Sequence, residues 1–256
     1  MKRYLALFVI IPSVVLSSFV IRKKQGLLIV FIGDSITYGG GLENPGTEAP
    51  PVATCDGLRK LPGIRRLVFS NQGVSGFTTV DFLPATATVF NKIIRAADDL
   101  TRENKGLLLF SIMLGTNDSA IEGPNGSPVS PASYRENLKT IADSLLKTYP
   151  GCKIVINRPV WYSPNTYNGA KYLEEGLQRL QSYFPEIDRL VSGYGATDPG
   201  RVYAGDKKAF DYFEMNYRTD LQTEQGRKGD FFLHPNKKGA AALGRFWADA
   251  IYSAVK

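Results

Sequence analysis

The sequence has 256 residues, of which 43% are hydrophobic and 21% are charged. This composition excludes an intrinsically disordered chain, because it supplies enough apolar surface for a core without metals or disulfides. The formal net charge of +7 comes from basic residues that are interleaved with acidic ones. Because the basic residues form no cluster and no nucleic-acid module is recognisable, we expect no nucleic-acid partner.

The first 24 residues, MKRYLALFVIIPSVVLSSFVIRKK, differ from the rest of the chain. They combine a basic start, an apolar run from Tyr4 through Val20 and small serines near its end, which is the pattern of a secretory signal. Pro12 and the serines argue against a permanent membrane span. We expect residues 1–24 to be a cleaved signal or, alternatively, an uncleaved membrane anchor. Residues 25–256 then form one exported domain, periplasmic or extracellular.

Short apolar runs recur along the remaining chain, and each is followed by a polar or helical segment. The runs are hydrophobic without alternation, which is typical of strands covered on both faces in a parallel sheet. The pattern predicts one doubly wound α/β domain, with a mainly parallel sheet of about five strands between helix layers. The runs begin at Gly26, Arg66, Gly106, Lys153 and Arg201.

Two helices have readable boundaries. Ser130 and Pro131 are typical of an N-cap and a first helical position, and the YPG sequence at 149–151 marks the end of this helix. A second helix is predicted from about Lys237, with apolar residues on one stripe. Each helix has an apolar stripe, formed by Tyr134, Leu138, Ile141 and Leu145 in the first helix and by Leu243, Trp247, Ala250, Ile251 and Ala254 in the second.

Polar, turn-forming segments follow the first three apolar runs: GDSITYGG, NQGVSG and GTND. The carboxyl ends of parallel strands meet at one edge of a sheet, so Ser35, Gly73 and Asn117 are expected there. The only histidine, His234, precedes the C-terminal helix, whose return to the sheet brings it to the same edge. A serine hydroxyl needs a base to become a nucleophile, and histidine suits that task near neutral pH. These parts indicate acyl transfer.

The segments GDSIT, NQGVSG, GTND and LHPN, in this order and at these intervals, resemble the four sequence blocks of the SGNH (GDSL-type) hydrolases. The surrounding GFTTVDFLP and NRPVWYSP are similar to secreted carbohydrate esterases, especially sialate-type O-acetylesterases. The resemblance implies a flavodoxin-like three-layer α/β/α fold. It also implies a serine esterase that removes short acyl groups, acetyl above all, from a carbohydrate, without a metal or organic cofactor.

The resemblance also implies a role for each matching residue. Ser35 attacks the ester carbonyl and forms an acyl intermediate, and His234 takes the proton and later returns it to the departing alcohol. The oxyanion is held by the backbone N–H groups of Ser35 and Gly73 and by the side chain of Asn117. Asp34, beside the nucleophile, is expected to pin the turn by hydrogen bonds to the backbone.

One position departs from the family pattern. The supporting aspartate usually stands three residues before the histidine, and that position is Phe231 here, with Asp230 one residue further back. A one-residue slip in an extended segment turns a side chain to the opposite face, so we expect a bulge that restores Asp230 to the imidazole. The alternatives are a backbone carbonyl, another acid, or a Ser–His dyad.

Three residues at the end of the fourth apolar run are candidates for binding substrate. Trp161 and Tyr162 offer aromatic faces to a sugar, with core packing as the alternative. Arg158 offers a charge to the carboxylate of a sialic or uronic acid, with a structural ion pair as the alternative. Cys55 and Cys152 permit one disulfide, and with a single distant histidine they do not form a metal-ligand cluster.

Two other functions remain open at this stage. A lysophospholipase or thioesterase of the same superfamily would need an apolar channel for a long acyl chain. An inactive glycan-binding module on a hydrolase scaffold would explain the displaced aspartate. The oligomeric state has no signal in the sequence.

Overall fold

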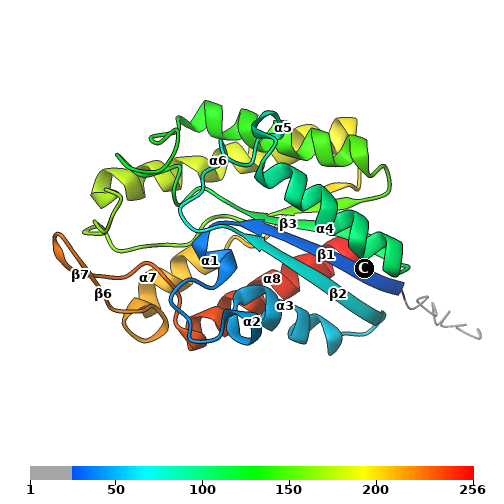
Figure 1. Cartoon of the computed structure of the whole chain (residues 1–256), viewed down its shortest axis with the longest axis horizontal. Helices are drawn as coiled ribbons and strands as arrows, with labels where there is room; N and C mark the ends of the chain where they lie inside the picture. Colours follow the sequence, from blue (N-terminus) through cyan, green and yellow to red (C-terminus); the bar gives the residue numbers. More distant parts are fainter. Residues whose placement is uncertain (1–24) are drawn as a thin grey trace, which may run out of the picture.

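The central layer of the protein is a parallel sheet. The structure, a computed structural model, describes residues 25–256, so the signal or anchor expected at residues 1–24 lies outside the described residues. The strand order is β2-β1-β3-β4-β5, which confirms the doubly wound parallel sheet (Figure 1). The strands are β1 (Gln25–Gly33), β2 (Ile64–Gly73), β3 (Leu107–Met113), β4 (Lys153–Ile156) and β5 (Val202–Ala204).

Helices cover both faces of this sheet, with α4, α5 and α6 on one face and α3, α7 and α8 on the other (Figure 1). In β1, Leu28, Val30 and Ile32 pack into one buried cluster, and the intervening residues pack into the second. Burial on both faces explains why the apolar runs do not alternate. The helices are α1 (Ser35–Tyr38), α2 (Pro45–Glu48), α3 (Pro50–Arg59), α4 (Val89–Glu103), α5 (Pro131–Thr148), α6 (Leu173–Thr197), α7 (Ala209–Asp220) and α8 (Lys237–Val255), with a 3-10 turn at Pro84–Thr86.

The two helices delimited from the sequence are confirmed as α5 and α8. Ser130 caps α5 by accepting a hydrogen bond from the backbone N–H of Ser133 at 3.1 Å. Asn236 caps α8 in the same way, with the N–H of Gly239 at 3.0 Å. Both caps satisfy donors that the first turn of a helix leaves free. Within residues 25–256, no helix has the length and apolar composition to cross a bilayer.

The sheet also separates the two cysteines. Cys55 is buried in the cluster that contains α8, and Cys152 is buried in the cluster on the opposite face. Both are free thiols, so the disulfide that the sequence permits is not formed.

A small hairpin carries the chain from α7 to α8. Its antiparallel strands are β6 (Glu224–Gly226) and β7 (Gly229–Phe231), and Figure 1 shows it projecting from the body of the protein beside α7. The sequence did not predict this hairpin, because its strands are short and largely polar. The chain then leads through His234 into α8, which returns to the sheet.

Candidate active site

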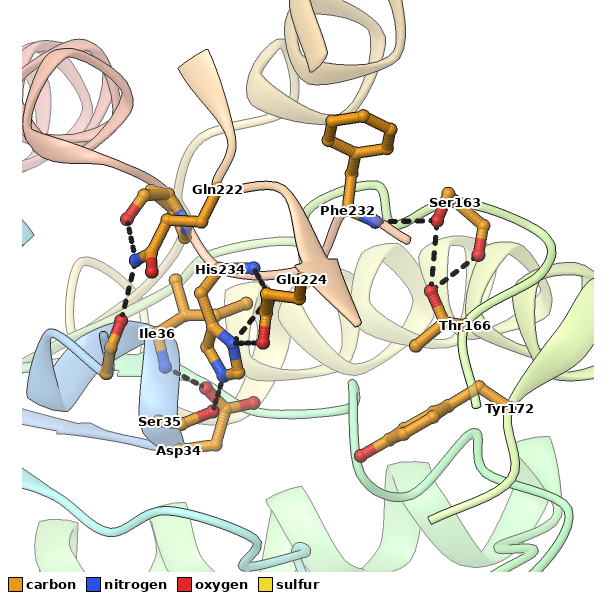
Figure 2. A network of polar contacts seen from close by, with 12 residues as sticks. Asp34, Ser35, Ile36, Ser163, Thr166, Tyr172, Gln222, Glu224, Phe232 and His234 are labelled. Carbon is orange, nitrogen blue, oxygen red and sulfur yellow. Dashed lines mark hydrogen bonds and ion pairs between the residues drawn. The ribbon is translucent and has the colours of Figure 1, made fainter. Parts of the chain in front are cut away.

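Ser35 lies at the first position of a one-turn helix that follows β1. Asp34 caps this helix, because its Oδ1 accepts the backbone N–H of Ile36 at 2.9 Å (Figure 2). This contact confirms the expected role of Asp34 in pinning the turn. Burial raises the pKa of the Asp34 carboxyl to about 6, against the opposing effects of the Ile36 N–H and of His234. The N–H of Ser35 has no partner within the helix, and no residue within 25–256 accepts it.

His234 lies beside Ser35, as the sequence predicts. Its Nε2 is 2.9 Å from the Ser35 Oγ, and its Nδ1 is 3.0 Å from each carboxylate oxygen of Glu224 (Figure 2). The backbone N–H of His234 also donates to Glu224 Oε1 at 3.1 Å. A carboxylate only accepts, so the imidazole proton lies on Nδ1 and the lone pair of Nε2 faces the serine hydroxyl. This is the tautomer that a general base requires.

The backbone around His234 is tied to the loop after α1. Gln222 donates its backbone N–H to the carbonyl of His234 at 2.8 Å. Its side-chain amide donates to the carbonyl of Gly40 at 3.1 Å and to that of Pro235 at 2.9 Å. The segment that carries the histidine is therefore fixed relative to the segment that carries the serine.

The structure corrects the expectation for Asp230. The Asp230 carboxylate accepts a hydrogen bond from the side chain of Gln225, its cross-strand neighbour in the hairpin, and it is exposed. Glu224 pairs instead with Phe231, the residue that stands where the family usually has its aspartate. Because cross-strand partners share a face of a hairpin, the acid reaches His234 from the opposite strand, without a bulge. Of the open alternatives, another acid is the one found.

Asn117 follows β3 and is buried at the same edge. Its Nδ2 donates to the carbonyl of Phe77 at 3.0 Å, and its Oδ1 accepts the hydroxyl of Tyr172 at 2.7 Å. One N–H of the amide is left without a protein partner among residues 25–256. Asn117 lines the same pocket as Ser35 and His234.

The structure also corrects the expectation for Gly73. Its N–H donates to the side-chain oxygen of Asn71 at 3.0 Å, so it is not available to a substrate. A Cβ at this position would lie 2.3 Å from the backbone nitrogen of Tyr38, which explains the glycine by close packing against α1. Gly76, three residues later, lines the pocket with Ser35 and has a φ of 79°. No residue within 25–256 accepts its N–H.

The pocket at this edge has a volume of about 650 Å³. The described residues that line it include no Asp, Glu, Lys or Arg, and His234 is the only titratable group apart from a tyrosine hydroxyl. Most of the lining is glycine or small polar side chains. The complete set is Ser35, Gly40, Gly41, Ser75, Gly76, Asn117, Gly123, Pro124, Asn168, Gly169, Ala170, Tyr172, Leu233 and His234.

The three residues predicted to bind substrate lie elsewhere. Trp161 is buried and its ring packs against Tyr217 at 5.3 Å. Tyr162 is fully buried, with its hydroxyl 2.9 Å from Ser119 Oγ. Arg158 pairs with Asp188 at 2.7 Å. Core packing and a structural ion pair, the alternatives left open by the sequence, are therefore what the structure shows.

Comparison with known proteins bears on the family and the fold. A family model described as the GDSL-like lipase/acylhydrolase family matches residues 31–242. Curated protein sequences give no match. A carbohydrate acetylesterase from Sinorhizobium meliloti is similar in structure, with a TM-score of 0.56 and 17% identity over 88% of this chain and 98% of that one.

Two further solved structures show the same fold. The aryl esterase of M. smegmatis has a TM-score of 0.55 at 16% identity, covering 89% of this chain and 99% of its own. A lipase/acylhydrolase from Enterococcus faecalis has a TM-score of 0.55 at 18% identity, covering 90% and 97%. At identities this low, the structural likeness shows that the α/β/α fold is shared. It does not show that the substrates are shared.

Proposed function

This chain belongs to the GDSL-like lipase/acylhydrolase family of esterases, and from that premise we propose that it removes acetyl or other short acyl groups from a neutral carbohydrate. The observation that carries the proposal is the contact of Ser35 Oγ with His234 Nε2 at 2.9 Å, in a pocket without charged side chains. Glu224 completes the arrangement by holding the other imidazole nitrogen.

The proposed reaction passes through an acyl-serine intermediate. Ser35 Oγ forms a bond to the ester carbonyl carbon while its proton moves to His234 Nε2, which leaves a negative charge on the carbonyl oxygen. The carbon–oxygen bond to the sugar then breaks, and His234 returns the proton to the departing alcohol oxygen. Water attacks the acyl-serine in the same way, with His234 first taking and then returning a proton. The products are the free sugar hydroxyl, the carboxylic acid and the original serine.

The negative charge that forms on the carbonyl oxygen must be stabilised by hydrogen-bond donors at the edge of the sheet. We assign the N–H of Ser35, the N–H of Gly76 and the free N–H of Asn117 to this task. Gly76 replaces Gly73 in the assignment, since the N–H of Gly73 is already bonded within the protein. Each donor aimed at developing charge commonly lowers the barrier by about 2.7 to 4 kcal/mol.

The chemistry of the pocket supports the choice of substrate. A long acyl chain requires a continuous apolar wall, and among the described residues the apolar side chains of the lining, Pro124, Ala170, Tyr172 and Leu233, are set among glycines and small polar residues. Recognition of a sialic or uronic acid by charge requires Lys or Arg, and neither lines the pocket among the described residues. The structural neighbour from S. meliloti, described as a carbohydrate acetylesterase, adds an independent reason to place a sugar here.

The test compares released acetate from a panel of acetylated neutral and acidic sugars, together with acetyl and octanoyl esters of one chromogenic alcohol. We expect turnover of acetylated neutral sugars and preference for the acetyl ester. Ser35→Ala and His234→Ala should each abolish hydrolysis, whereas Ser144→Ala, the same change at a half-buried position in α5 that does not line the pocket, should not. A preference for the octanoyl ester would identify a lipid-directed enzyme, and glycan binding without turnover would identify a binding module. Either result would overturn the proposal.

A further inference from the structure

The orientation of the Asn117 amide is set by two partners of different kinds. The carbonyl of Phe77 can only accept, so it selects the NH₂ end, at 3.0 Å. The hydroxyl of Tyr172 lies 2.7 Å from the other end, Oδ1. A reversed amide would set Oδ1 against the Phe77 carbonyl, with two acceptors facing each other. The two contacts together leave a single N–H free, and the residue lines the pocket beside Ser35.

Tyr172 is itself held rigidly at the entrance to α6. Its backbone N–H and that of Leu173 both donate to the carbonyl of Thr166 at 3.2 Å. Leu173 has a φ of 55°, in the left-handed region that a leucine rarely adopts. Such a conformation persists only where the surroundings enforce it, and it is often found beside functional sites. Here this turn leads the chain into α6, and Tyr172 lines the pocket.

The Tyr172 hydroxyl acts as a neutral donor. Burial raises the pKa of this phenol well above its ordinary value, so it stays protonated at any working pH. Its proton is directed to Asn117 Oδ1. A hydrogen bond that withdraws electron density from the oxygen of an amide strengthens the N–H groups of the same amide as donors, because bonded chains polarise one another.

We propose that Tyr172 is a positioning residue for ester hydrolysis, which holds and polarises the Asn117 amide so that its free N–H meets the charge that develops on the substrate. The inference rests on the proposed function of Ser35 and Asn117. Tyr172 acts through Asn117 and not by proton transfer.

The test is Tyr172→Phe, with Tyr162→Phe as its matched control. Tyr162 is also buried, its ring packs against Tyr172 at 5.3 Å, and its hydroxyl bonds to Ser119 instead of Asn117. Removal of an oxyanion donor costs about 100- to 1000-fold in kcat, so loss of its support should cost about 10-fold, with KM changed by less than about twofold. The control should keep kcat within about twofold of the parent. Equal kcat values in the two variants would overturn the proposal.

A double-mutant cycle separates positioning from a general structural role. In an Asn117→Ala background the support has nothing to act on, so Tyr172→Phe should lower kcat no further. If Tyr172→Phe lowers kcat by the same factor with and without Asn117, its effect does not pass through the amide and the proposal fails. Melting temperatures of all four proteins confirm that each is folded at the assay temperature.

A crystal structure of the parent protein with a phosphonate bound covalently to Ser35 provides a measurement that does not depend on the folding of any variant. The proposal requires Asn117 Nδ2 within hydrogen-bond distance of the adduct oxygen while the Tyr172 hydroxyl still contacts Oδ1. A reversed amide, or a Tyr172 hydroxyl bonded elsewhere, would overturn it. Activity in Ser35→Ala would instead refute the proposed function, so the two failures are distinguishable.

Discussion

Replacing Glu224 by glutamine tests how His234 is oriented. The two side chains have the same shape, but glutamine turns one of the two acceptor atoms into a donor. In the parent protein, Glu224 Oε1 accepts both the backbone N–H and Nδ1 of His234, and Oε2 is also 3.0 Å from Nδ1. The amide oxygen must keep the backbone N–H, so the NH₂ group takes the place of Oε2. Nδ1 keeps the amide oxygen as an acceptor but now also lies beside a donor in place of Oε2, so its orientation is weakened, and the negative charge beside the imidazole is lost.

The size of the effect follows from the charge that is lost. During the reaction His234 becomes positive, and a carboxylate 3.0 Å away stabilises that charge by about 5.5 kcal/mol at an effective dielectric constant of about 20. This value corresponds to about 10⁴-fold in rate. The side chains of His234 and Glu224 are 16% and 24% exposed, so water screens part of the interaction. We therefore expect Glu224→Gln to lower kcat/KM by about 100- to 10⁴-fold.

The assay measures acetate released from an acetylated sugar, beside a matched control, Asp230→Asn. This control makes the same acid-to-amide change on the other strand of the hairpin, where the carboxylate contacts Gln225, and it should keep kcat/KM within about twofold. A Glu224→Gln variant within about tenfold of the parent would show that His234 does not depend on this acid. A large loss in Asp230→Asn would restore the assignment made from the sequence.

Two further predictions concern stability. Gly73→Ala should lower the melting temperature and the activity together, because its Cβ would lie 2.3 Å from the Tyr38 nitrogen in α1, whereas Gly151→Ala, with no atom within 4 Å of the added carbon, should change neither. Burial raises the pKa of Asp118 from 3.8 to about 7. Between these two pH values the folded state keeps a proton that the unfolded state has released. The resulting stability is present at low pH and lost as the pH rises through 7, by about 2 to 3 kcal/mol between pH 5 and 8. Urea unfolding across this range should show a smaller decline in Asp118→Asn, and an unchanged decline would rule out Asp118 as its source.

The strands were predictable because burial on both faces makes their sequences almost continuously apolar. β1 and β3 are buried on both faces, so almost every position is apolar and the run is visible without an alignment. The meeting of Ser35 and His234 followed from topology, since strands of one direction end at one edge and α8 returns to it. Helices α5 and α8 were readable from their caps, which depend on residues local in sequence.

The acid was not predictable, because its position depends on strand register. Glu224 stands ten residues before His234 in a strand of only three residues, with no periodic pattern to identify it. Only the pairing of Glu224 with Phe231 brings the carboxylate to the imidazole. The assignment of Gly73 to the oxyanion failed for a similar reason: its N–H is taken by the side chain of Asn71, a contact that the sequence does not reveal.

Trp161 shows how a residue can be placed at the correct edge and still be given the wrong role. It follows β4, as expected, but its ring packs on Tyr217, and Tyr217 packs in turn on Phe232 at 4.8 Å. Phe232 exchanges two hydrogen bonds with Ser163: the backbone N–H of Ser163 donates to the Phe232 carbonyl at 2.8 Å, and the Ser163 hydroxyl accepts the backbone N–H of Phe232 at 2.8 Å. These contacts hold Phe232, which follows β7 and lies two residues before His234. Trp161, expected to form the wall of a sugar site, thus packs through Tyr217 against the segment that carries His234, so its part in the reaction is to support the position of the imidazole and not to contact the substrate.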